Sequence, residues 1–382
     1  MTSGARRRRL VLWGIMLAAS SAQATPARVG ALLGHPLFED DTDANRFPSV
    51  TGRYGRSVFL HLTGGGGTQA GLFYGGDRWL AGVTYGTPAA YDDLARISDE
   101  LGRPMLRPIR LVNAQLVRRL DEDSAVGFAL NPAFAITRAF PVGGPISNTV
   151  ALELEAVAGY SLSSKDLTAD VAAAISYHRF QQRSDGVTLA ETANVPSAVL
   201  RGRAFLRGVF GPGSDLGFYG ELARRDESFI QHEPFTSRVS LARYVAAAGV
   251  GPRIRPVEWA ALAGVLELDY ELLTGSVDRD GLAFSRVVFP SLQLAAEVNP
   301  LSWLFLRGAV ARRFTVTTER PQIGGQADFT SDAFTWATGA GVRWAHLEVD
   351  ATISNALLLN GPAFIGGNAP GLFGSISIRY PF

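Results

Sequence analysis

The chain has 382 residues, and its charges almost cancel, with 36 Lys and Arg against 35 Asp and Glu, which argues against a nucleic-acid partner. Only 19% of the residues are charged, below the roughly 25% of a typical soluble domain, although the chain is long enough for two or three such domains or for one large all-β body. Cysteine is absent, which excludes a disulfide framework, a thiolate metal site and a cysteine nucleophile.

The first 24 residues have the order of an export signal. Four arginines at 6–9 precede an apolar run at 10–19, and Ala22-Gln23-Ala24 is a small-x-small cleavage site. The apolar run is about ten residues long, which fits a secretory signal peptide and is too short for a spanning helix. We therefore expect residues 1–24 to be a signal peptide that is cleaved after Ala24.

Residues 25–56 separate this signal from the first predicted strand. They are interrupted by proline and glycine and carry the acidic stretch GHPLFEDDTDANRFP. We expect this segment to be either a short periplasmic extension or a plug that enters the barrel predicted below.

From residue 57 onward, apolar and polar residues alternate in long segments. Leu152 and Leu154, for example, share one face of their segment, and Glu153 and Glu155 share the other. One apolar face per strand, with acids on the opposite face, is typical of a membrane barrel that has lipid outside and a polar interior. The segments are also about twice as long as the 5–6 residues of an average soluble strand. The predicted strands are 57–63, 68–74, 78–85, 111–120, 125–137, 149–162, 167–180, 198–210, 216–226, 237–250, 260–273, 285–298, 303–316, 333–344, 346–358 and 372–382.

These strands predict an all-β fold, with residues 57–382 forming a transmembrane antiparallel β-barrel of about 16 strands, or about 14 if residues 57–74 fold elsewhere. Short connections, expected on the periplasmic side, alternate with longer external ones such as 274–284 and 317–332. The connection at 251–259 is long for its side. Four tryptophans beside the short connections predict an aromatic girdle: Trp79, Trp259, Trp303 and Trp344. The predicted short connections are 75–77, 121–124, 163–166, 211–215 and a turn at Asn299-Pro300.

The same alternation predicts which charged side chains face the lumen. An arginine at the lipid midplane costs about 2–4 kcal/mol, so these charges need a polar interior. Facing groups of opposite sign would create the transverse field of a porin constriction, or they would pair across strands and brace the wall. The predicted lumen residues are Glu153, Glu155, Asp170, Arg201, Arg203, Arg207, Glu221, Glu267, Asp269, Glu271, Arg307, Arg343, Glu348 and Asp350.

Residues 87–102, TPAAYDDLARISDELG, predict an amphipathic helix in an external loop. Thr87 fits the N-cap, Pro88 the first helical position and Gly102 the stop. Such a helix lies on the barrel mouth or folds into the pore. In the second case its acidic residues would make a cation-favouring constriction; these are Asp92, Asp93, Asp99 and Glu100.

The chain ends in GLFGSISIRYPF, a further alternating strand. Ile378, Tyr380 and Phe382 share one face, and Arg379 lies on the other. This ending resembles the C-terminal strand of Gram-negative outer-membrane β-barrel proteins, which finishes in phenylalanine with an aromatic residue two positions earlier. The resemblance implies an outer-membrane location, contact with outer-membrane lipid, and recognition of this strand by periplasmic chaperones and the barrel-assembly machinery.

Together these features favour a channel for passive diffusion of small polar solutes. One alternative is a gated transporter for hydrophobic molecules, with residues 25–56 as a hatch similar to that of fatty-acid-type outer-membrane transporters. Its apolar pocket would be lined by Phe140, Phe229, Phe235 and Phe364. A second alternative is a non-conducting structural or adhesive barrel. The five histidines lack metal-ligand spacing, and no catalytic motif is recognisable, so we expect no enzymatic activity, no metal and no cofactor.

Overall fold

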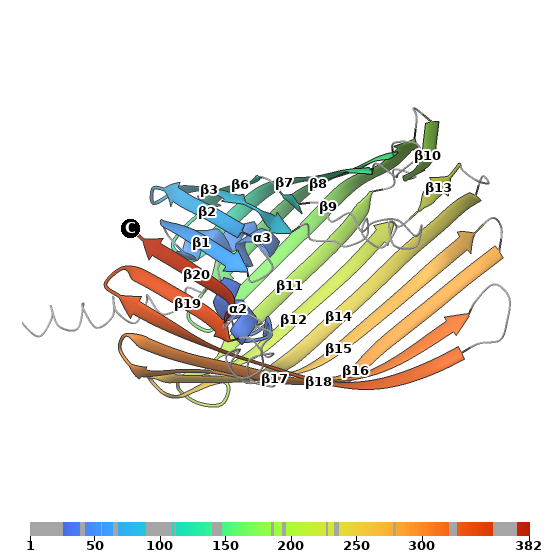
Figure 1. The fold of residues 1–382 in the computed structure, drawn as a ribbon. Helices are drawn as coiled ribbons and strands as arrows, with labels where there is room; N and C mark the ends of the chain where they lie inside the picture. The colour runs from blue at the N-terminus through green and yellow to red at the C-terminus, as the bar shows by residue number, and fades with distance from the viewer. Residues whose placement is uncertain are drawn as a thin grey trace, which may run out of the picture.

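The wall of the molecule is one closed antiparallel sheet, in which each long strand pairs with the next long strand along the chain (Figure 1). The computed structural model describes residues 26–38, 43–54, 56–63, 68–88, 109–110, 112–139, 147–184, 187–192, 196–226, 228–232, 237–277, 280–320, 327–353 and 373–382. Within these ranges, no helix has the length and apolar character needed to cross a membrane.

Sixteen strands make up the barrel. They are β1 (Ser57–Thr63), β2 (Thr68–Gly75), β3 (Trp79–Tyr85), β6 (Asn113–Arg119), β7 (Ser124–Ala139), β8 (Ser147–Ser163), β9 (Leu167–Ser184), β11 (Ser197–Arg207), β12 (Ser214–Asp226), β14 (Ser237–Val257), β15 (Ala260–Val277), β16 (Asp280–Leu301), β17 (Leu304–Arg320), β18 (Ala327–Trp344), β19 (Leu347–Ile353) and β20 (Phe373–Pro381). Short strands β4 (Thr87–Pro88), β5 (Ile109–Arg110), β10 (Val187–Thr192) and β13 (Phe229–Gln231) extend this wall.

The first and last strands close the barrel. β1 pairs with β20 from Ser57 opposite Pro381 to Thr63 opposite Ser375. The predicted all-β barrel with about 16 strands is therefore confirmed. The alternative of about 14 strands is wrong, because residues 57–74 supply β1 and most of β2 at the seam itself.

Side chains alternate between the two faces of the wall, as the pleat of a strand requires. In β9, Val171, Ile175 and Tyr177 are exposed on the outer face, whereas Asp170 and Ser176 are buried on the inner face. The exposed residues of the other strands are likewise mainly large and apolar. This outer apolar surface is what a lipid environment selects.

At one end of the barrel the strands are joined by tight turns. β14 runs to Val257, so only Glu258 and Trp259 connect it to β15, and the long connection expected at 251–259 is wrong. Pro256 falls within the register shift between Ile254 and Val257. A strand tolerates proline at such an irregularity because no ladder hydrogen bond is lost there.

Two further connections differ from the sequence expectation because the strands beside them continue past their expected ends. The turn expected at Asn299-Pro300 lies inside β16, again at a register irregularity, and the observed turn is 302–303. At the opposite end, β15 and β16 pair as far as Val277 and Asp280, which corrects the loop expected at 274–284. These strand ends carry polar residues on both faces, so they lack the apolar alternation by which the strands were recognised.

The strands are unequal in height. β14 to β18 have 17 to 22 residues each, and they reach much farther toward the right of Figure 1 than β19, β20, β1 and β2 do. A tilted strand needs only about 9–11 residues to cross the apolar band. The ends of the long strands therefore extend beyond it, and the first nine residues of β18 are accordingly exposed apart from Ala327.

The N-terminal part of the chain lies inside this wall (Figure 1). We call residues 26–38 and 43–54 the inner segment. It consists of α2 (Pro26–Ala31), α3 (Asp43–Arg46), the 3-10 helix η2 (Pro48–Val50) and α4 (Thr51–Tyr54). Its apolar side chains complete two buried clusters with the wall: Phe47 and Val50 pack with Phe73 and Val117, and Leu32 and Leu37 pack with Phe205 and Val265.

Candidate functional site: the lumen and the inner segment

The charged residues predicted for the lumen lie on the inner face of the wall. Glu155, Asp170 and Arg203 are almost fully buried, and the others are buried or half-buried apart from Arg207. Arg207 is exposed near the tight turns, where it donates a hydrogen bond to Thr168 at 2.7 Å. The acidic residues of the predicted constriction helix lie outside the described residues. Its predicted start is wrong, because Thr87 and Pro88 form β4 and pair with β5.

Many of these charges pair across neighbouring strands. Arg203 of β11 donates to Asp170 of β9 at 2.7 Å, and Arg343 of β18 donates to Glu348 of β19 at 2.7 Å. Arg243 of β14 lies 3.2 Å from Glu271 of β15. Opposite charges on adjacent strands brace the wall, because each guanidinium satisfies a carboxylate that is shielded from lipid.

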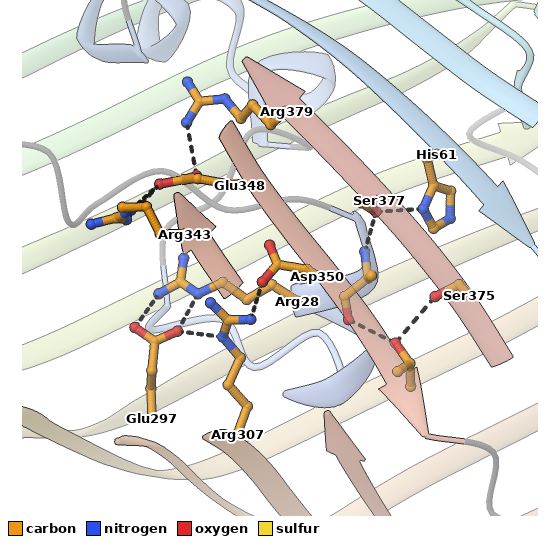
Figure 2. A network of polar contacts seen from close by, with 12 residues as sticks. Arg28, His61, Glu297, Arg307, Arg343, Glu348, Asp350, Ser375, Ser377 and Arg379 are labelled. Atoms are coloured by element: carbon orange, nitrogen blue, oxygen red, sulfur yellow. Dashed lines mark hydrogen bonds and ion pairs between the residues drawn. The ribbon is translucent and has the colours of Figure 1, made fainter. Parts of the chain in front are cut away.

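Other lumen charges hold the inner segment. Glu297 of β16 accepts hydrogen bonds from Arg28 of α2 at 2.6 Å and from Arg307 of β17 at 2.6 Å, and Arg307 also binds Asp350 of β19 (Figure 2). The carboxylate of Glu297 is thus shared between the inner segment and the wall. Removing one partner of such a buried ion pair leaves the other uncompensated, which is why these contacts fix position strongly.

The start of the inner segment is bound at the seam of the barrel. The backbone N–H of Ala27 donates to the Ser377 hydroxyl of β20 at 2.9 Å, and its carbonyl accepts from Thr352 of β19 at 2.7 Å (Figure 2). Ser377 Oγ also lies 2.6 Å from Nδ1 of His61 on β1. One serine therefore connects the first strand, the last strand and the inner segment.

The remainder of the inner segment is held by the opposite side of the wall. Arg203 donates to Asp43 at 2.5 Å, and Arg53 donates to Asp170 at 2.7 Å. Thr51 donates to Gln115 of β6 at 2.9 Å. Anchors from β6, β9, β11, β16, β19 and β20 thus surround the segment.

Lumen side chains also donate hydrogen bonds to backbone carbonyls of the inner segment, including that of Leu32, which already accepts from the N–H of His35 at 3.0 Å. Gln293 Nε2 donates to the carbonyls of Leu32 and Leu33 at 3.2 Å each, and Arg253 donates to that of Leu37 at 3.2 Å. Buried carbonyls need such partners because water does not reach them. The inner segment is therefore held by side chains and makes no ladder with the described strands.

A polar cavity of about 300 Å³ lies between the inner segment and strands β11, β12, β14, β15, β16 and β17. Its inner-segment side includes His35 and Arg46, and its wall side includes Glu221, Glu267 and Arg313. Burial lowers the pKa of His35 to about 4, and the backbone of Gln293 opposes this shift only in part. The imidazole is therefore neutral at neutral pH.

Sequence reasoning missed the inner-segment half of the site. Arg28, Asp43, Arg46 and Arg53 carry no periodic signal, because the segment has no strand alternation. The only hint was that charged residues occur in a segment otherwise broken by proline and glycine. Neutral lumen residues were missed because only charged ones were considered: Gln115, Gln293, Thr352 and Ser377.

Two further expectations concern an apolar pocket and a metal site. The side chains of Phe140, Phe229, Phe235 and Phe364, expected to line an apolar pocket, lie outside the described residues. Among the residues that are described, no group of three or more His, Asp and Glu is arranged to hold a metal ion.

No protein-family model matches the sequence, and no curated protein matches it. Among solved structures, the chain is similar to a FadL homologue of Pseudomonas aeruginosa, with 12% identity, a TM-score of 0.46 and coverage of 94% of this chain and 98% of that one. It is similar to the toluene transporter TodX of Pseudomonas putida, with 9% identity, a TM-score of 0.40 and coverage of 89% and 91%.

The ferric yersiniabactin uptake receptor FyuA from Yersinia pestis is similar at 12% identity and a TM-score of 0.43, over 78% of this chain and 53% of that one. The present chain thus spans about half the length of FyuA and about three fifths of the CdiB chains of Acinetobacter baumannii and Escherichia coli. At these identities the likeness carries no information on a substrate. The closed antiparallel barrel with an apolar outer surface is the fold of a membrane-spanning β-barrel, and its C-terminal strand resembles that of Gram-negative outer-membrane β-barrel proteins.

Proposed function

We propose that the protein is an outer-membrane channel for small polar solutes whose lumen is closed at rest by the inner segment. The observation that carries this proposal is the ring of side-chain anchors from strands on all sides, which includes the buried Arg28–Glu297–Arg307 contact. A segment anchored all round occupies the cross-section of the barrel. We therefore propose a gated channel in place of the permanently open channel for passive diffusion that the sequence favours.

The polar character of the lumen supports polar solutes over hydrophobic ones. The inner face of β8, β9 and β15 presents Glu153, Asp170 and Glu271, and β11 and β14 present Arg203 and Arg243. A desolvated apolar solute gains nothing from such a surface, whereas a hydrated or charged solute exchanges water for these groups at little cost.

The way the inner segment is held supports gating over permanent closure. It is held by apolar packing and by ion pairs and hydrogen bonds from lumen side chains, and the described wall closes without it through β1 and β20. The segment can therefore leave the lumen without breaking a strand ladder. A non-conducting structural barrel is the competing outcome of the test.

Single-channel recording in planar bilayers tests the proposal with the mature protein and a variant that lacks residues 26–54. We expect rare, small openings from the full-length protein and steady ohmic conductance from the deletion variant. Because a deletion can impair folding, Glu297→Gln provides a second variant that loosens one buried anchor, and it should raise the open probability at least ten-fold. Glu258→Gln, in an exposed turn, is the matched control and should behave as the wild type.

Two results would contradict the proposal. Full conductance by the unmodified protein would mean that the inner segment does not close the lumen. Silence from a folded deletion variant and from Glu297→Gln would mean that the barrel does not conduct, as the structural alternative requires. Folding in each case is established independently by heat-modifiable migration in detergent.

A further inference from the structure

The cavity beside the inner segment has the dimensions of a small-molecule site. Its volume of about 300 Å³ lies at the lower end of the range for ligand pockets. It is bounded by the inner segment on one side and by β11, β12, β14, β15, β16 and β17 on the other, so any molecule bound there touches both parts that gating separates.

On one side of the cavity several arginines share one carboxylate. Glu221 Oε2 already accepts a hydrogen bond from Arg201 at 2.8 Å, and Arg46 reaches the same oxygen at 3.2 Å. Arg225 approaches the other oxygen at 3.9 Å. One carboxylate thus serves three guanidinium groups, and the Arg46 side chain remains 56% exposed.

Arg313 adds a further cation, whose charge acts on the nearby carboxylate of Asp269 without forming an ion pair with it. It projects from the inner face of β17, is exposed, and forms no ion pair with the described residues. Because a guanidinium offers five donors, an Arg313 side chain that lines a cavity is suited to bind an incoming carboxylate.

The same cavity contains a carboxylate that has no cation partner. Glu267 of β15 forms no ion pair with the described residues; it accepts a hydrogen bond from the Ser291 hydroxyl at 3.3 Å, and the Tyr219 hydroxyl interacts with the same carboxylate. The remaining acid in the lining, Asp43, is already bound by Arg203 at 2.5 Å. Glu267 is therefore the group suited to bind an ammonium.

These two charges lie in one row of the sheet. Glu267 is in register with Ser291 of β16, and Ser291 is in register with Arg313 of β17. Strands are about 4.8 Å apart, so the Cα atoms of Glu267 and Arg313 are separated by roughly 10 Å. An acid and a base at this spacing bracket a molecule that carries a carboxylate and an ammonium on the same carbon.

We propose that this cavity binds a small zwitterion of the α-amino acid type, with the carboxylate on Arg313 and Arg46 and the ammonium on Glu267. The inference rests on the proposed function, because it names the solute class of the same channel. Leu33, Phe38 and Phe47 line the cavity as well and provide apolar surface for a side chain.

Titration calorimetry of the mature, detergent-solubilised protein tests the proposal with three matched probes. L-leucine carries both charges, 4-methylpentanoate lacks the ammonium, and 3-methylbutylamine lacks the carboxylate. We expect L-leucine to bind at least ten-fold more tightly than either single-charge probe. This comparison needs no variant, so it does not depend on the folding of a mutant protein.

Variants then locate the site. Arg313→Gln and Glu267→Gln should each weaken L-leucine binding at least ten-fold, and each should remove the advantage over one single-charge probe. Arg312→Gln is the matched control: Arg312 is the next residue of β17, faces the outside and binds Asp332 at 2.6 Å. Its substitution should leave L-leucine binding unchanged.

Absence of L-leucine binding, equal binding of L-leucine and 4-methylpentanoate, or unchanged binding in both lumen variants would overturn the inference. These results are separable from the test of the channel itself. A deletion variant that conducts, together with a full-length protein that does not bind L-leucine, removes only the zwitterion site. L-leucine binding by a barrel that never conducts removes only the channel.

Discussion

At the scale of single residues, the lumen is organised by carboxylates that have more than one cationic partner. Glu297 serves Arg28 and Arg307, and Asp170 serves Arg53 and Arg203. A buried ion pair adds little net stability compared with an apolar pair, because both charges lose their water. Its effect is to fix position: a shifted inner segment would leave several buried charges without partners.

His35 should make the docking of the inner segment depend on pH. Burial lowers its pKa from 6.5 to about 4, so the docked state favours the neutral imidazole. In the undocked state the pKa returns toward 6.5. Docking therefore keeps its full strength above pH 6.5 and weakens as the pH falls toward 4, by up to about 3 kcal/mol.

The rate at which a protease cleaves the inner segment, measured between pH 7 and pH 4, checks this prediction. Cleavage should accelerate at low pH in the wild type and should be nearly independent of pH in His35→Gln. Glu221, Glu267 and Asp43 also face this cavity, beside the arginines, and they remain in both proteins. An equal acceleration in His35→Gln would assign the effect to those carboxylates and contradict the role of His35.

At the scale of elements, the inner segment fits the wall because glycines allow close approach. Gly127 of β7 lies against the backbone of Pro48 and Ser49, and Gly217 of β12 lies against Leu37. A glycine within a strand commonly marks such a backbone approach. At Gly127 the neighbouring atoms are backbone, so they have no rotamer by which to make room for a side chain.

Gly127→Ala should therefore displace η2 from the wall and leave the wall itself intact. We expect the variant to conduct in planar bilayers as the deletion of residues 26–54 does, while its unfolding free energy changes by about 1 kcal/mol or less. Gly202→Ala is the control, since an added Cβ there meets only the Asp170 carbonyl at 3.7 Å. Wild-type closure in Gly127→Ala would show that η2 does not contribute to the seal.

At the scale of the whole molecule, the apolar band must lie nearer the tight-turn end of the long strands. Leu130 and Ile136 share the outer face of β7 and are both exposed, but Ile136 lies six residues farther from the tight turn. At about 3.3 Å per residue and a tilt of about 45°, Leu130 falls near the midplane and Ile136 beyond the band.

Leu130→Arg should accordingly destabilise the barrel and lower its free energy of unfolding in lipid by about 2–4 kcal/mol, whereas Ile136→Arg should lower it by about 0–1 kcal/mol. Reversible urea unfolding in liposomes measures both values. An equal loss of unfolding free energy at the two positions would place the membrane farther from the tight turns. That result would contradict the orientation derived from the tight turns and the exposed tryptophans.

The sequence by itself determined the barrel, its strand faces and its charged lumen. Each residue of a strand faces either lipid or the polar lumen. The polarity of Leu154 and Glu155 therefore indicates which face each occupies, even when the neighbouring strands are unknown. The sequence did not predict the proline-containing ends of β14 and β16 or the polar ends of other strands. At these ends the alternation stops while the hydrogen-bonded ladder continues.

Only the tertiary structure decided what occupies the lumen. Arg28 meets Glu297 across 269 positions of sequence, and Glu267 lies in one row with Arg313 because three strands adopt a particular register. Such pairings depend on how distant segments are brought together, and the local pattern of either segment carries no information on its partner. The position of the inner segment and the cavity beside it are therefore properties of the closed barrel.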